Sequence, residues 1–272
     1  MIFPDYHLHS KFSSDSDTDI YDIIHTARQR GMTSICLTDH YDMDFPSLPE
    51  APGMDFNLDI DTYYTCLKNI QAELSKDFDL RIGVELGIMP ETIDKLNTYV
   101  NKHPFFDFII ASVHLVDGMD PYYPRYFEGK TEHQAFLRYF ESILYFAKKY
   151  NAYDVCGHLD YIVRYGKNKA NNYNPVDYYD IFDELFKTII PKGKGIELNT
   201  GSLYKGLDFA HPHPKLLKMY KEAGGEIITI GSDAHKIEFI GYGFDKAREL
   251  LLSNGFKYYC TFKQRKPTFH KL

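Results

Sequence analysis

The chain has 272 residues, of which 44% are hydrophobic and 25% are charged, a composition typical of a globular protein with a substantial core. Lys and Arg number 31 against 38 Asp and Glu, so the formal net charge is −7. The composition excludes disorder for most of the chain, and the charge argues against sequence-independent binding to nucleic acid, because no Lys- or Arg-rich stripe is present to neutralise phosphates.

Neither a membrane span nor a disulfide framework is expected. No run approaches the roughly 18 apolar residues of a membrane-spanning helix. The first ten residues, MIFPDYHLHS, lack a basic region followed by an apolar one. The cysteines are far apart and form no CxxC pair, which argues against a zinc ribbon, a redox motif or disulfides: Cys36, Cys66, Cys156 and Cys260. We therefore expect a cytoplasmic protein with no membrane partner.

Short apolar runs of strand length recur along the chain, and longer amphipathic stretches follow them. The expected strands cover residues 2–8, 34–38, 81–85, 108–113, 153–156, 195–198 and 226–230, with residues 256–262 closing the series. Alternating strands and helices favour parallel strands joined by right-handed crossovers. We expect one α/β domain over residues 1–272, arranged as a barrel.

Three of the expected helices have recognisable ends. Residues 18–19 cap a helix that runs to Arg30, and the glycine that follows ends it. An Asn-Pro pair at residues 174–175 begins a second helix, which stops at Pro191. A third covers residues 214–223, directly before two glycines.

Titratable residues gather at the ends of the expected strands. Of the twelve histidines, six lie at or just past a strand end. In a (β/α) barrel these ends open on one face, where active sites are built. Glu85 lies in an apolar strand and is costly to bury unless it is paired or bound to metal. Any one of these residues alone is compatible with an ordinary core side chain, but together they favour a metal centre.

The residues occur in a characteristic order: HxH with a following Asp, TDH, an isolated Glu, SVH, GHLD and GSDAH. This order resembles the polymerase and histidinol phosphatase family over residues 5–235. Within the family, the segments SVHLVDG, GHLDYIVRYG and ELNTGSL look like the histidinol-phosphate phosphatases. The resemblance implies a distorted seven-stranded, TIM-like (β/α) barrel with three adjacent divalent metal ions.

The resemblance also sorts the metal ligands. The implied sets are His7, His9, Glu85 and Asp233 for one ion; the bridging Glu85 with His114 and His158 for a second; and Asp15, His40 and His235 for a third. Asp15 stands where some relatives carry histidine, and helix capping is its alternative role. Imidazoles and carboxylates without thiolate suit Zn²⁺, Mn²⁺ or Fe²⁺ and do not discriminate among them.

The implied activity is hydrolysis of a small-molecule phosphate monoester, L-histidinol phosphate, by attack of a metal-bridging hydroxide, as in histidine biosynthesis. Three divalent ions outweigh three carboxylates, so the pocket is expected to attract a phosphate dianion despite the negative net charge of the chain. The alternatives are a phosphoesterase acting on nucleotides or phosphotyrosine, a metal-dependent C–N hydrolase and a non-catalytic metal-binding module. The sequence does not predict an oligomeric state.

Further residues are candidates for catalysis and substrate binding. Asp160 and His213 are equal candidates for protonating the leaving alkoxide. Arg164 is a candidate for clamping phosphate with its planar guanidinium, and a surface ion pair is its alternative role.

The stretch at residues 116–130 is too long and polar for a tight turn, so we expect it to cover the substrate. Its acidic residues Asp117 and Asp120 are candidates for binding a cationic amine or imidazole, with plain solubility as their alternative role.

Overall fold

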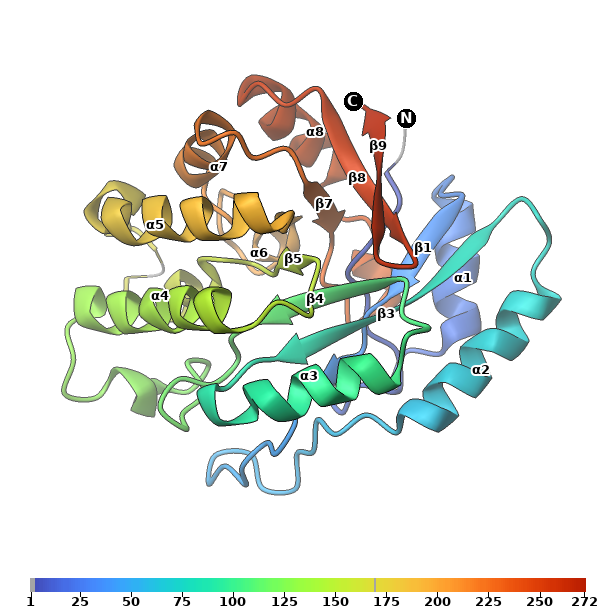
Figure 1. The fold of residues 1–272 in the computed structure, drawn as a ribbon, viewed down its shortest axis with the longest axis horizontal. Coiled ribbons are helices and arrows are strands. Elements are labelled where there is room, and N and C mark those ends of the chain that lie inside the picture. Colours follow the sequence, from blue (N-terminus) through green and yellow to red (C-terminus); the bar gives the residue numbers. More distant parts are fainter. Residues whose placement is uncertain (1–2, 169) are drawn as a thin grey trace.

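The structure, a computed structural model, describes residues 3–168 and 170–272, and within them seven strands form one curved parallel sheet surrounded by helices (Figure 1). The strand order is β1-β3-β4-β5-β6-β7, with β2 also paired to β3. The strands are β1 (Ser34–Leu37), β2 (His40–Tyr41), β3 (Asp79–Gly87), β4 (Phe108–Ser112), β5 (Val155–Cys156), β6 (Gly195–Asn199) and β7 (Ile228–Gly231). The fold is the distorted TIM-like barrel expected from the sequence.

The N-terminal segment closes the sheet between β1 and β7. On one side, the N–H groups of Cys36 and Thr38 donate to the carbonyls of Asp5 and Leu8, at 2.8 and 2.9 Å. On the other side, Tyr6 N–H donates to the carbonyl of Ile230 at 3.0 Å. The expected strand at residues 2–8 is therefore an extended segment with isolated bridges rather than a continuous ladder, and its first residue, Ile2, lies outside the described residues.

Helices follow the strands and cover the outside of the barrel (Figure 1). They are α1 (Ile20–Gln29), α2 (Ile60–Glu73), α3 (Ile93–Lys102), α4 (Glu132–Lys149), α5 (Tyr179–Ile189), α6 (Gly201–Tyr204), α7 (Pro214–Glu222) and α8 (Phe244–Ser253). The predicted ends of α1 are confirmed, because Asp19 accepts a hydrogen bond from Tyr21 N–H and Gly31 has a φ of +79°. The prediction of α7 is confirmed as well.

The second predicted helix is interrupted at both ends. Its first turn, Pro175–Tyr178, is a 3₁₀ turn, and the Asn174 side chain makes no capping bond to it. At the other end the chain continues past α5 through a second 3₁₀ turn, Ile190–Lys192, so Pro191 lies inside the last turn instead of ending the helix before it. A proline is tolerated there because the first N–H groups of a turn need no partner within it.

The last predicted strand forms but does not join the barrel sheet. It corresponds to β8 (Tyr258–Lys263), which pairs antiparallel with β9 (Lys266–Lys271) in a separate hairpin. The two turn residues, Gln264 and Arg265, both have positive φ, at 49° and 63°, as a tight two-residue turn requires. The expectation that residues 256–262 close the barrel series is therefore wrong.

A continuous hydrophobic core lies between the sheet and the helices. It is rich in buried aromatic side chains, such as Tyr63 from α2, Phe140 from α4 and Phe182 from α5. The rings of Phe140 and Phe182 lie 4.8 Å apart, which joins α4 to α5. In the described part of the chain, the helices are all too short or too polar to cross a membrane.

Candidate metal centre

The nine side chains predicted as metal ligands meet at the carboxyl ends of the strands. They come from the N-terminal segment (His7, His9), the loop before α1 (Asp15), β2 (His40), β3 (Glu85), and the loops after β4 (His114), β5 (His158) and β7 (Asp233, His235). Parallel strands make this possible, since their carboxyl ends all open on the same rim.

Glu85 lies at the centre of the cluster and is fully buried. Its Oε2 atom lies 3.1 Å from His7 Nε2, 3.5 Å from His9 Nε2 and 3.1 Å from His40 Nδ1. Three imidazoles from two separate segments therefore converge on one oxygen.

The second oxygen of Glu85 faces two further histidines. Its Oε1 atom lies 3.3 Å from His114 Nε2 and 3.0 Å from His158 Nε2, and it accepts a hydrogen bond of 2.6 Å from the Ser112 hydroxyl. Gly157 leaves room for that hydroxyl, because a Cβ there would lie 2.4 Å from Ser112 Oγ. Glu85 thus has the two-sided environment of a bridging carboxylate.

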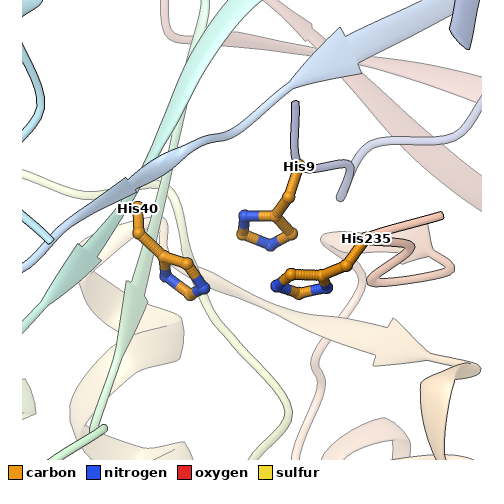
Figure 2. A group of neighbouring side chains, drawn as sticks. All are labelled: His9, His40 and His235. Carbon is orange, nitrogen blue, oxygen red and sulfur yellow. The ribbon is translucent and has the colours of Figure 1, made fainter. Parts of the chain in front are cut away.

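The remaining carboxylates lie on the outer side of the cluster. Asp233 Oδ1 lies 3.5 Å from His9 Nε2 and 3.7 Å from His235 Nδ1. Asp15 Oδ2 lies 3.0 Å from His235 Nε2 and 3.7 Å from His40 Nε2. Figure 2 shows the rings of His9, His40 and His235 turned toward one another. Asp15 therefore lies with this group of histidines, and the residue that caps α1 is Asp19.

Asp233 is held in a strained backbone conformation. Its φ is +55°, in the left-handed region that a side chain other than glycine rarely adopts. Its N–H donates to the carbonyl of His7 at 2.9 Å, and its own carbonyl accepts from the Tyr204 hydroxyl at 2.7 Å. The preceding residue, Ser232, donates through both its N–H and its hydroxyl to the buried carboxylate of Asp5. This surrounding network fixes the strained residue at the site.

The charges of the cluster are strongly coupled. Burial lowers the pKa of His7, but the charges of Glu197, Glu85 and Asp233 outweigh burial and raise it well above its ordinary value. Burial raises the pKa of Glu85, but neighbouring histidines outweigh burial and hold it well below its ordinary range. Burial and the neighbouring imidazoles lower the pKa of His9 well below its ordinary value. The site thus combines an ionised carboxylate, Glu85, with one imidazole that favours protonation, His7, and one that resists it, His9.

Unpaired buried atoms fit a bound cation. The following atoms are buried without a hydrogen-bond partner within the described residues: His7 Nε2, His9 Nε2, His40 Nδ1, Glu85 Oε2 and His235 Nε2. Such atoms are costly unless something else binds them. Three overlapping groups each bring their ligand atoms within 4.8 Å of one another: His9, His40 and His235; His7, His9 and Glu85; and His40, Glu85 and His114. This donor set can hold a divalent metal.

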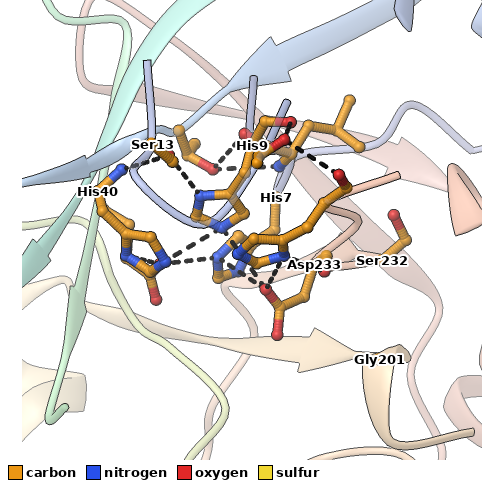
Figure 3. Close-up of polar contacts among 12 residues, drawn as sticks. His7, His9, Ser13, His40, Gly201, Ser232 and Asp233 are labelled. Atoms are coloured by element: carbon orange, nitrogen blue, oxygen red, sulfur yellow. Dashed lines mark hydrogen bonds and ion pairs between the residues drawn. The ribbon is translucent and has the colours of Figure 1, made fainter. Parts of the chain in front are cut away.

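Several polar residues that support the cluster were missed in the sequence. Asp42 Oδ2 lies 2.7 Å from His114 Nδ1. Ser13 Oγ lies 3.1 Å from His9 Nδ1 (Figure 3) and donates a 2.8 Å hydrogen bond to Asp39 Oδ1. Partners of this kind orient the imidazoles of metal sites. Asp39 and Asp42 lie on either side of His40, just past the strand predicted at residues 34–38, which was the available signal.

A cavity of about 770 Å³ opens on the cluster, a size that suits a small molecule. Seven of the nine predicted ligands line it, all except His7 and His9. Apolar side chains from the segment between β2 and α2 form another part of its lining: Phe45, Leu48, Ala51, Met54 and Phe56. The cavity lining therefore combines candidate metal ligands with apolar side chains.

Three cationic side chains line the cavity: Arg164, Lys205 and Lys236. Arg164, in the 3₁₀ turn Tyr161–Tyr165, lies with its guanidinium carbon 4.8 Å from the ring centre of Tyr161 and 4.7 Å from that of Tyr165. Lys205, which was missed in the sequence, has its Nζ 3.8 Å from Asp233 Oδ2. Burial and the charge of Arg164 lower the pKa of Lys205 to about 8. These groups place positive charge in the cavity lining.

The two acidic residues of the segment at residues 116–130 face different environments. Asp120 lines the cavity, and burial raises its pKa. Asp117 lies outside the cavity lining and forms a two-point ion pair with Arg138 of α4 on the surface. The segment itself is anchored by the buried ring of Tyr126, whose hydroxyl donates to the carbonyl of Ala135 at 2.8 Å.

Asp160 and His213 are brought close together but outside the cavity lining. Asp160 is fully buried; its Oδ1 lies 2.7 Å from His211 Nδ1, and its Oδ2 accepts from His213 N–H at 2.9 Å. The Nδ1 atom of His213 accepts from Lys215 N–H at 3.1 Å and caps α7. The sequence singled out His213, whereas the buried partner of Asp160 is His211.

Comparisons with known proteins agree with this architecture. The family model described as PHP domain matches residues 5–201. The histidinol-phosphatase of Lactococcus lactis is 32% identical over 263 residues, covering 96% of this chain and 95% of that protein. A probable histidinol-phosphatase of Clostridium acetobutylicum is 32% identical, covering 92% of each chain. A crystal structure of the Lactococcus lactis histidinol phosphate phosphatase, complexed with zinc, L-histidinol and phosphate, has a TM-score of 0.88, with 32% identity and 98% of each chain covered.

Proposed function

The chain belongs to the PHP family, and from this premise we propose that it is a metal-dependent phosphatase that hydrolyses L-histidinol phosphate to L-histidinol and phosphate. The observation that carries the proposal is the cluster around Glu85, which opens on a cavity lined by cationic side chains, apolar side chains and the half-buried Asp120. The relative with 32% identity that was crystallised with zinc, L-histidinol and phosphate supports the same substrate.

We propose that the cluster holds three divalent ions. The ligand sets are those expected from the sequence: His7, His9, Glu85 and Asp233; Glu85, His114 and His158; and Asp15, His40 and His235. Divalent cations bound there lower the pKa of water and neutralise phosphoryl oxygens. The short distances from both Glu85 oxygens to histidine nitrogens support a bridging role for this residue.

The phosphate group is proposed to lie between the cluster and the cationic side chains. Arg164 offers a planar pair of donors held against two tyrosine rings, and such a fork matches phosphate oxygens. Lys205 offers a second positive charge from another loop. Both residues bind and orient the phosphate in this proposal.

The amino-alcohol end of the substrate is proposed to face Asp120 and the apolar side chains of the cavity lining. L-histidinol carries an ammonium group, which the half-buried carboxylate of Asp120 in the cavity lining attracts. Phe45 and Phe56 offer flat apolar surface to an imidazole ring. Asp117 has no part in this proposal, since Arg138 already neutralises it.

The leaving alkoxide must gain a proton. We propose a positioning role for Asp160 and His213, because Asp160 uses both carboxylate oxygens in contacts within the protein and His213 uses its backbone N–H and its Nδ1 atom. The proton then comes from a group inside the cavity or from water.

The proposal is tested by measuring phosphate release from L-histidinol phosphate and from a panel of other monoesters that includes nucleotides and phosphotyrosine. We expect the highest kcat/KM for L-histidinol phosphate and loss of turnover with a chelator. A preference for a nucleotide or for phosphotyrosine would replace the proposed substrate, and full turnover after metal removal would refute the metal-dependent mechanism.

We also propose that residues 1–272 fold as one domain. The main cluster of buried hydrophobic side chains includes Phe3, Tyr139 and Tyr259 and so draws on distant parts of the chain. Limited proteolysis is expected to leave no stable fragment, and recovery of a folded fragment shorter than the chain would contradict this proposal.

A further inference from the structure

Glu197 is a buried carboxylate that touches a predicted metal ligand from behind. It lies in β6 and is 1% exposed. Its Oε1 atom lies 2.6 Å from His7 Nδ1. Its Oε2 atom accepts hydrogen bonds from His158 N–H at 3.0 Å and from the Asn199 side-chain amide at 3.1 Å. Glu197 therefore joins the N-terminal segment, the end of β5 and β6.

The chemistry of these contacts fixes the orientation of the His7 ring. A carboxylate offers only acceptors, and the other two partners of Glu197 are obligatory donors. The proton of His7 then lies on Nδ1 and points at Glu197. The opposite nitrogen, Nε2, lies 3.1 Å from Glu85 Oε2 and 3.8 Å from Asp233 Oδ1, free to act as a ligand.

Gly231 leaves space for this pair. A Cβ at residue 231, the last residue of β7, would lie 2.3 Å from His7 Cβ and 2.5 Å from Glu197 Oε1. The residue has an ordinary φ, so the requirement for glycine comes from space alone. The end of β7 is thus shaped around the contact between His7 and Glu197.

We propose that Glu197 is a positioning residue that holds His7 in the Nδ1–H form and thereby sets how tightly the cluster retains a divalent cation. The inference rests on the proposed function only in taking the cluster as a metal site. Glu197 lies outside the cavity lining within the described residues, so it acts through His7 and without touching substrate.

The first test compares Zn²⁺ affinities, measured by competition with a chromophoric chelator. Glu197→Gln keeps the shape of the side chain but offers an amide group to donors, and we expect affinity to fall about 10- to 100-fold. Gly231→Ala, which crowds the same contact, is expected to weaken binding as well.

Asp154→Asn is the matched control. Asp154 is also buried and accepts from Ile109 N–H at 2.9 Å, but it precedes β5 and so lies at the opposite end of the barrel. The Asp154→Asn variant should have a lower melting temperature and less than a twofold change in Zn²⁺ affinity. Affinity that is unchanged in Glu197→Gln, or reduced equally in both variants, would overturn the proposal.

A measurement on the unmodified protein covers the case in which the variants do not fold. In the Zn²⁺-loaded protein with ¹⁵N-labelled histidine, we expect the proton of His7 on Nδ1, with His7→Asn used to assign the signal. A proton on Nε2, or failure of the protein to bind Zn²⁺, would overturn the inference. Zn²⁺ binding with the expected tautomer but no phosphate release would leave it standing and refute the proposed function alone.

Discussion

The Nδ1 atom of His211 lies 2.7 Å from Oδ1 of Asp160, and neither side chain is exposed. The second oxygen of Asp160 accepts from His213 N–H, so one carboxylate ties the turn after β5 to the segment that enters α7. Arg164 belongs to that turn. This arrangement predicts that Asp160 places the guanidinium and does not itself transfer a proton.

Asp160→Asn should therefore impair all phosphate monoesters to a similar extent. The Asn side chain accepts only through its oxygen, so its NH₂ group faces one of the two donors that now bond to Asp160, His211 Nδ1–H or His213 N–H. The loss of that hydrogen bond lowers the free energy of unfolding by about 1–3 kcal/mol. The kcat/KM values for L-histidinol phosphate and for p-nitrophenyl phosphate should fall by the same factor. A proton donor would behave differently, since p-nitrophenolate leaves without protonation; selective loss of the alkyl phosphate would restore Asp160 to that role.

Replacement of Arg164 should weaken binding of the phosphate group. Arg164→Ala removes a charged donor that lines the cavity, and hydrogen bonds to charged groups are worth about 1.5–3 kcal/mol, so kcat/KM should fall about 10- to 100-fold. We expect most of the loss in KM and a matching loss of affinity for inorganic phosphate as an inhibitor. Arg138→Ala is the control, because Arg138 pairs with Asp117 at the surface. Equal KM values for Arg164→Ala and the unmodified protein would exclude the phosphate contact.

Asp120 should determine selectivity for a cationic substrate. Asp120→Asn removes the negative charge in the cavity lining and is expected to lower kcat/KM for L-histidinol phosphate about tenfold, at roughly 1.4 kcal/mol for each factor of ten. Turnover of phenyl phosphate, which has no ammonium group, should change little. Asp117→Asn should affect neither substrate. If discrimination between the two substrates survives in Asp120→Asn, the ammonium contact assigned to this residue is wrong.

Much of the fold follows from local pattern in the sequence. The strands at residues 108–112 and 195–199 are short and mostly apolar, and all of their residues are buried, as is typical of strands in parallel sheets that are covered on both faces. The convergence of the predicted ligands can also be predicted from the sequence, because it depends only on strand order and on which end of each strand carries polar residues. These features depend on residues close together in the chain.

The features that the sequence did not predict depend on contacts across the fold. Gln264 and Arg265 form the tight turn of the last hairpin, although neither is a residue that favours positive φ. Asp107 helps to fix that turn by accepting from Gln264 N–H at 3.0 Å, a partner 157 positions away. Glu197 stands in an apolar strand as Glu85 does, yet only the fold reveals that it faces a histidine from the N-terminal segment.

Removal of metal should abolish turnover and lower the melting temperature together. Without a cation, Glu85 and the surrounding histidines keep buried polar atoms that lack hydrogen-bond partners within the described part of the chain, and each such atom destabilises the folded state. A ligand that binds only the folded state stabilises it by about 2.7 kcal/mol at 100 times its dissociation constant. For a chain of this size, that amount corresponds to a rise of roughly 5–10 °C in the melting temperature.

Dialysis against a chelator, followed by addition of Zn²⁺, Mn²⁺ or Fe²⁺ separately, should show which ion restores both turnover and thermal stability. Restoration of thermal stability without turnover by all three ions would indicate a structural metal site and would count against catalysis at this cluster.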